Sequence, residues 1–130
     1  MKYFILMFSL ISLLNADFDW PGDYDEALKI AKKEKKEIYL MIGSANCRFC
    51  EKFENVVLMD KDVYKNLTQD FVPLYLSKDI DDIPEGLKTS PIPRHYFLDE
   101  NGKVIESMIG YRGQECFYNI LEDIRELRKK

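Results

Sequence analysis

The sequence predicts an α/β fold in which helices flank a central mixed sheet of about four strands. Two short, almost wholly apolar runs, 37–42 and 71–76, have the length of buried strands, and the segments between them carry helical periodicity. Buried strands joined through helices are typically parallel. Residues 96–98 and 104–109 flank an Asn-Gly turn, which is typical of an antiparallel hairpin. Together these patterns predict a small layered sandwich.

The first residues have the layout of a secretory signal peptide, predicted over residues 1–16. A basic start precedes an almost unbroken apolar run at 3–14, and Ala16 offers a small residue for cleavage. That run is shorter than the ~20 residues that a membrane-spanning helix needs. We therefore expect cleavage after about Ala16, export, and one domain over residues 17–130.

Charge and cysteine content narrow the function classes. The formal net charge is −4 at pH 7, which argues against binding to nucleic acid or to anionic lipid. The chain has three cysteines, so they cannot all pair within it. In an exported protein, the close pair Cys47 and Cys50 with a separate Cys116 indicates a working disulfide and one further thiol.

A helix is expected before the first strand. Asp23 and Glu26 have the spacing of a capping box, and the lysines at 32–36 suit the negative end of the helix dipole. Its apolar face consists of Tyr24, Ala27, Leu28 and Ala31. The strand that follows, Glu37 to Ile42, is apolar at nearly every position, as expected for burial on both faces of a sheet.

The period changes to helical directly after the cysteines, where Phe49, Phe53 and Val57 recur every four residues. A break near 59–62 should be followed by one or two further helical turns. The second strand, 71–76, contains Pro73, which favours an edge position.

The last third of the chain begins with a polar connection at 77–90. The hairpin strands follow, and the second is expected to end at Gly110. A final helix is predicted from about Gly113 to Lys130. Its apolar stripe consists of Phe117, Ile120, Leu121, Ile124 and Leu127.

The two close cysteines lie where a strand changes into a helix. Thiol–disulfide exchange needs one thiolate to attack and a second thiol to resolve the mixed disulfide. At the first turn of a helix, unpaired N–H groups stabilise an anion. Cys47 is therefore expected to be the exposed nucleophile and Cys50 the buried resolving thiol. Arg48 adds a cation beside the nucleophile.

Two other interpretations of the cysteines remain open. A structural disulfide across so short a loop would constrain the unfolded chain little. A zinc site needs four ligands, and only His95 and Cys116 are left to complete it. A metal-delivery module using Cys47, Cys50 and His95 is thus an alternative, although a strand histidine with a local hydrogen-bond partner is the simpler expectation. Cys116 is most simply a passive thiol.

A longer set of residues carries a family resemblance. These are Trp20, Ala27, Ala31, Cys47, Cys50–Glu54, Val63, Phe71–Pro73, Ile92–Pro93, Phe97–Asp99, Asn101–Lys103 and Gly110–Tyr111. The chain resembles the thioredoxin-fold superfamily, most of all exported thioredoxin-like reductases and the periplasmic C-terminal domain of DsbD. The resemblance implies a three-layer sandwich, a cis-proline at Pro93 beside the site, and a substrate loop of Ile92, Pro93 and Gly110. It also implies that the exported protein is periplasmic.

The departures from the family pattern are concentrated around the site. Asn46 replaces the usual tryptophan, and Met41 stands where the family carries a buried aspartate. Glu54, which matches an acid in the DsbD domain, is the expected substitute, although an exposed helix glutamate is an equal alternative. Arg94 replaces the usual threonine after the cis-proline. Arg94, Arg48 and Phe49 are therefore candidate modulators of partner choice.

We expect a thiol–disulfide oxidoreductase that reduces protein disulfides, receives electrons from a membrane thiol reductase, and acts as a monomer. Its redox group would be the Cys47–Cys50 disulfide, with no further cofactor and no metal. A disulfide oxidase or isomerase of the same fold is the nearest alternative.

Overall fold

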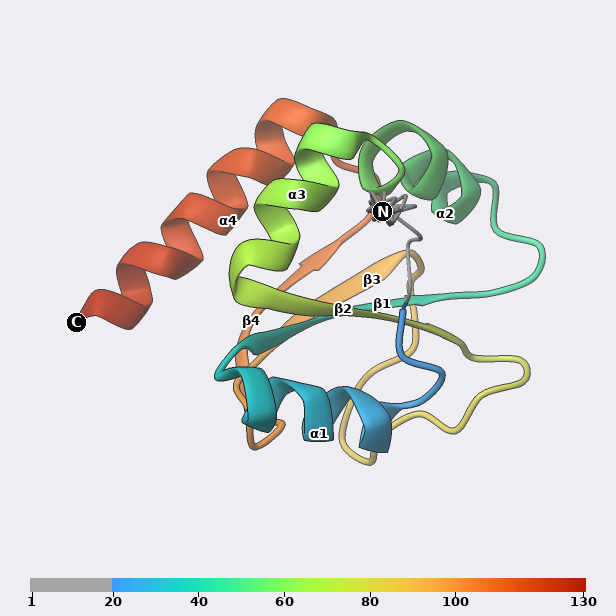
Figure 1. Cartoon of the computed structure of the whole chain (residues 1–130). Coiled ribbons are helices and arrows are strands. Elements are labelled where there is room, and N and C mark those ends of the chain that lie inside the picture. Colours follow the sequence, from blue (N-terminus) through green and yellow to red (C-terminus); the bar gives the residue numbers. More distant parts are fainter. Residues whose placement is uncertain (1–19) are drawn as a thin grey trace, which may run out of the picture.

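The computed structural model describes residues 20–130, which form one mixed sheet with helices on both faces (Figure 1). The expected signal peptide lies outside the described residues. The elements are α1 (Tyr24–Glu34), β1 (Glu37–Gly43), α2 (Arg48–Phe53), the π-helix η1 (Glu54–Leu58), α3 (Lys61–Asp70), β2 (Phe71–Ser77), β3 (Arg94–Leu98), β4 (Val104–Ile109) and α4 (Gln114–Lys129). The predicted α/β class is confirmed. Within this part of the chain, no helix is long and apolar enough to cross a membrane.

The strands are ordered β2-β1-β3-β4. Strand β1 pairs in parallel with β2 and antiparallel with β3, and β3 continues antiparallel into β4. The parallel pair and the hairpin are as predicted, and Pro73 lies on β2, an edge strand, as expected. Every residue of β1 is buried, because helices cover both of its faces.

Helix α1 covers one face of the sheet, and α2, η1, α3 and α4 cover the other (Figure 1). Alternate residues of β1 face opposite layers, since side chains alternate along a strand. Ile38, Leu40 and Ile42 pack in the cluster that includes α1. Tyr39 and Met41 pack in the larger cluster beneath the other helices. The larger cluster also contains Cys50, so the site rests directly on a core layer.

The capping box predicted for α1 is present in part. Asp23 Oδ1 accepts from the Glu26 N–H at 2.8 Å and so satisfies a donor that the first helical turn would otherwise leave open. Glu26 Oε2 accepts at 2.7 Å from the N–H of Gly22, one residue before the N-cap, and not from the N–H of Asp23. The helix ends at Glu34, and its C-cap Lys35 has a φ of 55°, in the left-handed region.

Helix α2 runs without interruption into the wider turn of η1, which was not predicted. The N–H of Met59 bonds to the carbonyl of Glu54 at 2.8 Å, the i→i+5 pattern of a π-helix. Helix α3 is longer than the one or two turns expected. Its start is fixed by Asp60, whose carboxylate accepts from the N–H groups of Asp62 and Val63 at 3.0 Å each.

The hairpin and the last helix follow the sequence prediction closely. The turn places Gly102 at φ +85°, and β4 ends at Ile109 before Gly110. In α4, Phe117, Leu121 and Ile124 are buried. Leu127 is 53% exposed, so its predicted place in the apolar stripe is wrong.

Candidate active site

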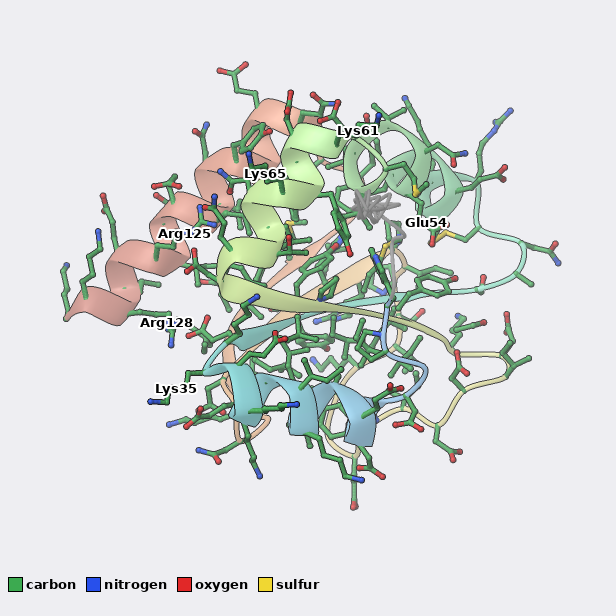
Figure 2. All side chains as sticks on the ribbon, in the orientation of Figure 1. Lys35, Glu54, Lys61, Lys65, Arg125 and Arg128 are labelled. Atoms are coloured by element: carbon green, nitrogen blue, oxygen red, sulfur yellow. A yellow bond between two sulfur atoms is a disulfide. The ribbon has the colours of Figure 1, made fainter. Side chains whose placement is uncertain are left out.

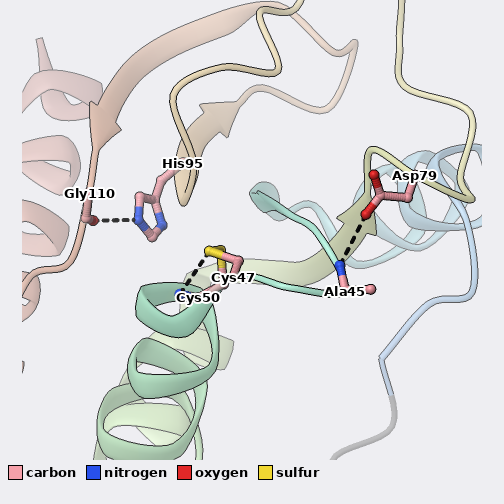
Figure 3. Close-up of a disulfide and its surroundings, with 6 residues drawn as sticks. All are labelled: Ala45, Cys47, Cys50, Asp79, His95 and Gly110. Atoms are coloured by element: carbon pink, nitrogen blue, oxygen red, sulfur yellow. Dashed lines mark hydrogen bonds between the residues drawn. A yellow bond between two sulfur atoms is a disulfide. The ribbon is translucent and has the colours of Figure 1, made fainter.

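The cysteine pair lies at the end of β1, where the chain leaves the sheet and enters α2 (Figure 3). Cys47 is the N-cap of α2, and its Sγ is bonded to Cys50 Sγ at 2.07 Å. The same Cys47 Sγ accepts from the Cys50 N–H at 3.1 Å. The preceding loop is held by Asp79, whose Oδ2 accepts from the Ala45 N–H at 3.1 Å. The cap position therefore directs a helical N–H at the sulfur of Cys47.

The two sulfurs differ in their access to solvent. Cys47 is half-buried, whereas Cys50 is 2% exposed and packs in the larger core cluster. The residues between them, Arg48 and Phe49, are exposed, and Phe49 retains 56% of its accessible surface. An incoming disulfide can therefore reach Cys47 and cannot reach Cys50 directly.

The core next to Cys50 has an apolar side chain at the position where the family resemblance implies a buried aspartate. Met41 is fully buried and packs in the cluster that contains Cys50. Its parallel neighbour on β2 is Tyr75, which is half-buried. Glycine at position 43 leaves space that both Tyr75 and Cys50 approach.

Glu54 is the acid associated with this end of the helix. It is half-buried and lies between the α2–η1 helix and the sheet (Figure 2). Burial raises the pKa of its carboxyl, and the negative charge of Glu51 raises it further. The charge of Glu54 in turn helps raise the pKa of Tyr75, after the larger effect of burial.

The loop before β3 forms a second feature of the site. The Ile92–Pro93 peptide bond is cis, as is Ser90–Pro91. Pro93 is buried, and its carbonyl accepts from the Gly110 N–H at 2.8 Å. The three residues expected to form the substrate loop, Ile92, Pro93 and Gly110, are thus brought together.

His95 connects this loop to the core. Its ring is fully buried, with Nδ1 at 2.6 Å from the Tyr39 hydroxyl. The other ring nitrogen, Nε2, lies 3.0 Å from the Gly110 carbonyl oxygen (Figure 3). Burial lowers the pKa of His95 to about 4, so the ring is neutral at physiological pH. His95 is a strand histidine with hydrogen-bond partners, as expected, but both partners are distant in sequence and are brought to it by the fold.

These bonds bear on the metal alternative. A ligand role for His95 would require a ring nitrogen that is now used by Tyr39 or Gly110. Within residues 20–130, no group of three or more His, Cys, Asp or Glu could hold a metal ion. Cys116, the remaining thiol, is exposed and unpaired on the first turn of α4.

Arg94 is not brought to the cysteines through its charged group. Its Nε donates to the Tyr96 hydroxyl at 2.8 Å, and its Nη1 donates to the Ser90 carbonyl at 3.1 Å. Tyr96 belongs to the cluster on the α1 side of the sheet. Arg94 therefore braces the loop before Pro93, whereas Arg48 and Phe49 lie exposed beside the disulfide.

Sequence reasoning missed Tyr75 and Tyr39. Both lie on predicted strands, and nothing local distinguishes them from other core aromatics. The strand register could have identified them. In that register Tyr75 lies opposite Met41, and Tyr39 lies two residues before Met41 on the same face of β1.

The sequence matches the thioredoxin-like domain family over residues 24–125. The chain belongs to this family. The Cys47–Cys50 disulfide at the start of α2 gives this thioredoxin-like protein the two sulfurs that thiol–disulfide exchange requires.

Solved structures show the same fold. The structure of DsbH Oxidoreductase is 20% identical in sequence, with a TM-score of 0.63 and coverage of 84% of this chain and 85% of that one. The oxidised C-terminal domain of DsbD from Neisseria meningitidis is 19% identical, with a TM-score of 0.56 and coverage of 76% and 90%.

Two curated relatives match shorter stretches. An uncharacterized protein of Archaeoglobus fulgidus is 24% identical over 41% of this chain, and human spermatogenesis-associated protein 20 is 30% identical over 47%. The matches span 42% and 8% of those relatives' own lengths.

Proposed function

We propose that this thioredoxin-like protein is an exported reductant of protein disulfides. The observation that carries the proposal is the unequal pair of sulfurs: Cys47 is accessible at a helix N-cap, and Cys50 is buried behind it. Helical N–H groups stabilise a thiolate on Cys47, which is the attacking species in exchange. The resolving thiol is shielded from competing disulfides.

The reaction proceeds in two exchange steps. In the reduced protein, the Cys47 thiolate attacks one client sulfur; the client disulfide breaks, and its other sulfur leaves with the electron pair and takes up a proton. Cys50, as a thiolate, then attacks Cys47 Sγ. The Cys47–Cys50 bond forms, and the client sulfur that was bonded to Cys47 leaves as a thiolate. Two electrons have then passed to the client.

The client segment would lie along the loop before β3. Extended peptides bind through backbone hydrogen bonds to exposed strand edges. Ile92 would supply those backbone groups, Pro93 would present them, and Gly110, bonded to the Pro93 carbonyl, would hold the loop in place. Arg48 and Phe49, exposed beside Cys47, would contact client residues that flank the disulfide.

Glu54 is the proposed acceptor of the Cys50 proton. Its backbone N–H bonds to the Cys50 carbonyl, one helical turn away, and its carboxyl is half-buried with a raised pKa. A base works best when its pKa lies near the operating pH, so the upward shift suits this role. Replacing Glu54 by Gln should therefore slow the resolving step in single-turnover reduction of a client disulfide.

Export and electron supply complete the proposal. The signal-peptide pattern at residues 1–16 supports a periplasmic location, where a membrane thiol reductase would return the disulfide to the dithiol. The protein would act as a monomer, with its own disulfide as the redox group. The family resemblance at Ile92 and Glu54 supports reduction over oxidation.

Trapping tests the function directly. With Cys50 replaced by Ser, the mixed disulfide on Cys47 cannot resolve, so a client should accumulate as an adduct. The matched control carries Ser at both positions and should trap nothing. Adducts that form equally in the control would refute the proposed chemistry.

The reduction potential tests the direction of electron flow. Equilibration with glutathione or thioredoxin should give a value near the ~−270 mV of thioredoxin. A value near the ~−120 mV of DsbA would make the protein an oxidase or isomerase of the same fold.

A further inference from the structure

The floor beneath Cys50 contains a tyrosine hydroxyl that the proposed mechanism has not used. Met41, which occupies the family's acid position, is fully buried and can neither take up nor share a proton. Tyr75 is its register partner on β2, lies in the same core layer, and is half-buried. Beside Met41, where an acid is absent, the neutral hydroxyl of Tyr75 is therefore the neighbouring polar group.

Gly43 is the backbone position that both this hydroxyl and the sulfur of Cys50 approach. A Cβ at position 43 would lie 2.8 Å from Tyr75 Oη and 3.2 Å from Cys50 Sγ. The oxygen and the sulfur therefore both border the space that a Cβ at position 43 would fill. A side chain at that position would push one or both of these atoms aside, because the two distances are tighter than ordinary packing allows.

The surroundings of Tyr75 are acidic. The charged groups around it are Glu54 on η1 and Asp79 and Asp81 after β2; Glu51 on α2 acts on Glu54. Burial first, and then these carboxylates, raise the pKa of Tyr75, so its hydroxyl keeps its proton and remains a donor. The same negative charges disfavour a thiolate on Cys50. A nearby neutral donor would offset them.

The redox state decides whether the donor has an acceptor. In the oxidised protein, Cys50 Sγ is bonded to Cys47 and carries no charge. During resolution the same sulfur becomes a thiolate, and hydrogen bonds to charged acceptors are roughly twice as strong as neutral ones. The hydroxyl gains a strong acceptor only at the step in which Cys50 reacts.

We propose that Tyr75 is a positioning residue that donates a hydrogen bond to the Cys50 thiolate and lowers the pKa of that thiol. The inference rests on the proposed role of Cys50 as the resolving thiol. The tyrosine proton stays on Oη throughout. The Cys50 thiolate attacks Cys47 Sγ, the intramolecular disulfide forms, and the client sulfur leaves with the electron pair and takes its proton from water.

Titration of the reduced full chain tests the hydrogen bond without any client. The Cβ chemical shift of Cys50 is followed by NMR against pH in wild type and in Tyr75→Phe, which removes only the hydroxyl. We expect the Cys50 pKa to rise by about one unit, a tenfold change in thiolate fraction. The matched control is Tyr24→Phe, another half-buried tyrosine, which packs against Gly102 in the hairpin turn and should leave the titration unchanged.

The resolving rate provides a second signature that a purely structural role would not give. A less acidic thiol is a better nucleophile once ionised, with a Brønsted coefficient of ~0.4–0.5. At neutral pH the tenfold loss of thiolate should be partly offset, which leaves Tyr75→Phe about threefold slower. Above both thiol pKa values, the variant should become about threefold faster than wild type.

The outcomes separate this inference from the proposed function. An unchanged Cys50 pKa in Tyr75→Phe overturns the inference, as does a rate loss that is equal at every pH. Gly43→Ala should raise the Cys50 pKa as Tyr75→Phe does, and the two changes together should add nothing further. If wild type fails to reduce any protein disulfide, the proposed function fails, while the titration still reports on Tyr75.

Discussion

Acidification should weaken the fold through His95, the single histidine of the chain. Burial lowers its pKa from 6.5 to about 4, so the folded protein resists protonation that the unfolded chain accepts. The stability from the neutral ring is complete above about pH 6.5 and is lost as the pH falls toward 4. A shift of this size corresponds to about 3 kcal/mol. That is a large share of the ~5–15 kcal/mol that stabilises a typical domain.

The assay is equilibrium urea unfolding of the oxidised protein across this pH range, for wild type and His95→Phe. Phenylalanine keeps a ring against Phe53, whose centroid lies 4.7 Å from that of His95, and it cannot titrate. At neutral pH the variant should be less stable, because the buried Tyr39 hydroxyl loses its partner. The difference between the two proteins should shrink by about 3 kcal/mol as the pH falls to 4.

Only the difference between the two proteins is diagnostic, because other groups titrate in the same range. Glu37, for example, has a pKa raised to about 7, and it contributes equally to both proteins. A difference in unfolding free energy that stays constant from neutral pH to pH 4 would refute the reasoning. It would mean that His95 is as easily protonated in the fold as in the unfolded chain.

Three further predictions follow from single side chains. Burial raises the Glu37 pKa to about 7, so the wild-type protein should lose stability as the pH rises from about 4.5 to 7. Over that range, urea unfolding should show the Glu37→Gln variant gaining about 2 kcal/mol of stability relative to wild type. This is less than the full shift implies, because the Arg128 partner is partly solvated. Arg48→Gln should slow alkylation of Cys47 by about threefold or less, because an exposed cation is screened. Cys116→Ser should leave the single-turnover reduction of a client disulfide unchanged, since this thiol is exposed and unpaired.

The parts of the fold that the sequence predicted are those with local causes. The α1 capping box uses residues three apart, and the hairpin depends on one Asn-Gly turn. Strand β1 was recognisable because burial on both faces leaves an unbroken apolar run. Each of these signals lies within a few residues of the structure it produces.

The sequence predictions were wrong or incomplete where the hydrophobic period of a helix does not show what its residues pack against or where its hydrogen bonding changes. Leu127 continues the α4 stripe, yet it is 53% exposed near the end of the helix. The π-turn of η1 changes the helical period without any proline or glycine to mark it. Helix α3 was underestimated because Asp60, its cap, was assigned to a break.

The site was predictable to a similar degree. Cys47 and Cys50 are close in sequence, so their pairing and their place on the helix could be inferred. The bonds of His95 to Tyr39 and Gly110 span 56 and 15 residues, and they depend on strand order and register. The meeting of Tyr75 and Cys50 at Gly43 likewise requires a parallel pairing that periodicity does not specify.

The N–H of Cys50, which points at Cys47 Sγ across 3.1 Å, serves both states of the disulfide. Toward a disulfide sulfur it is a weak donor, and toward a thiolate it becomes a charge-assisted one. Reduction should therefore strengthen this hydrogen bond at the start of α2. The same bond sets a limit on function: every increment that favours the thiolate also stabilises the reduced protein, as in the strong oxidant DsbA. A reductant of this design must therefore keep the Cys47 thiol only moderately acidic. A stronger hydrogen bond from the Cys50 N–H would increase the thiolate fraction of Cys47 and, at the same time, make the protein a weaker reductant.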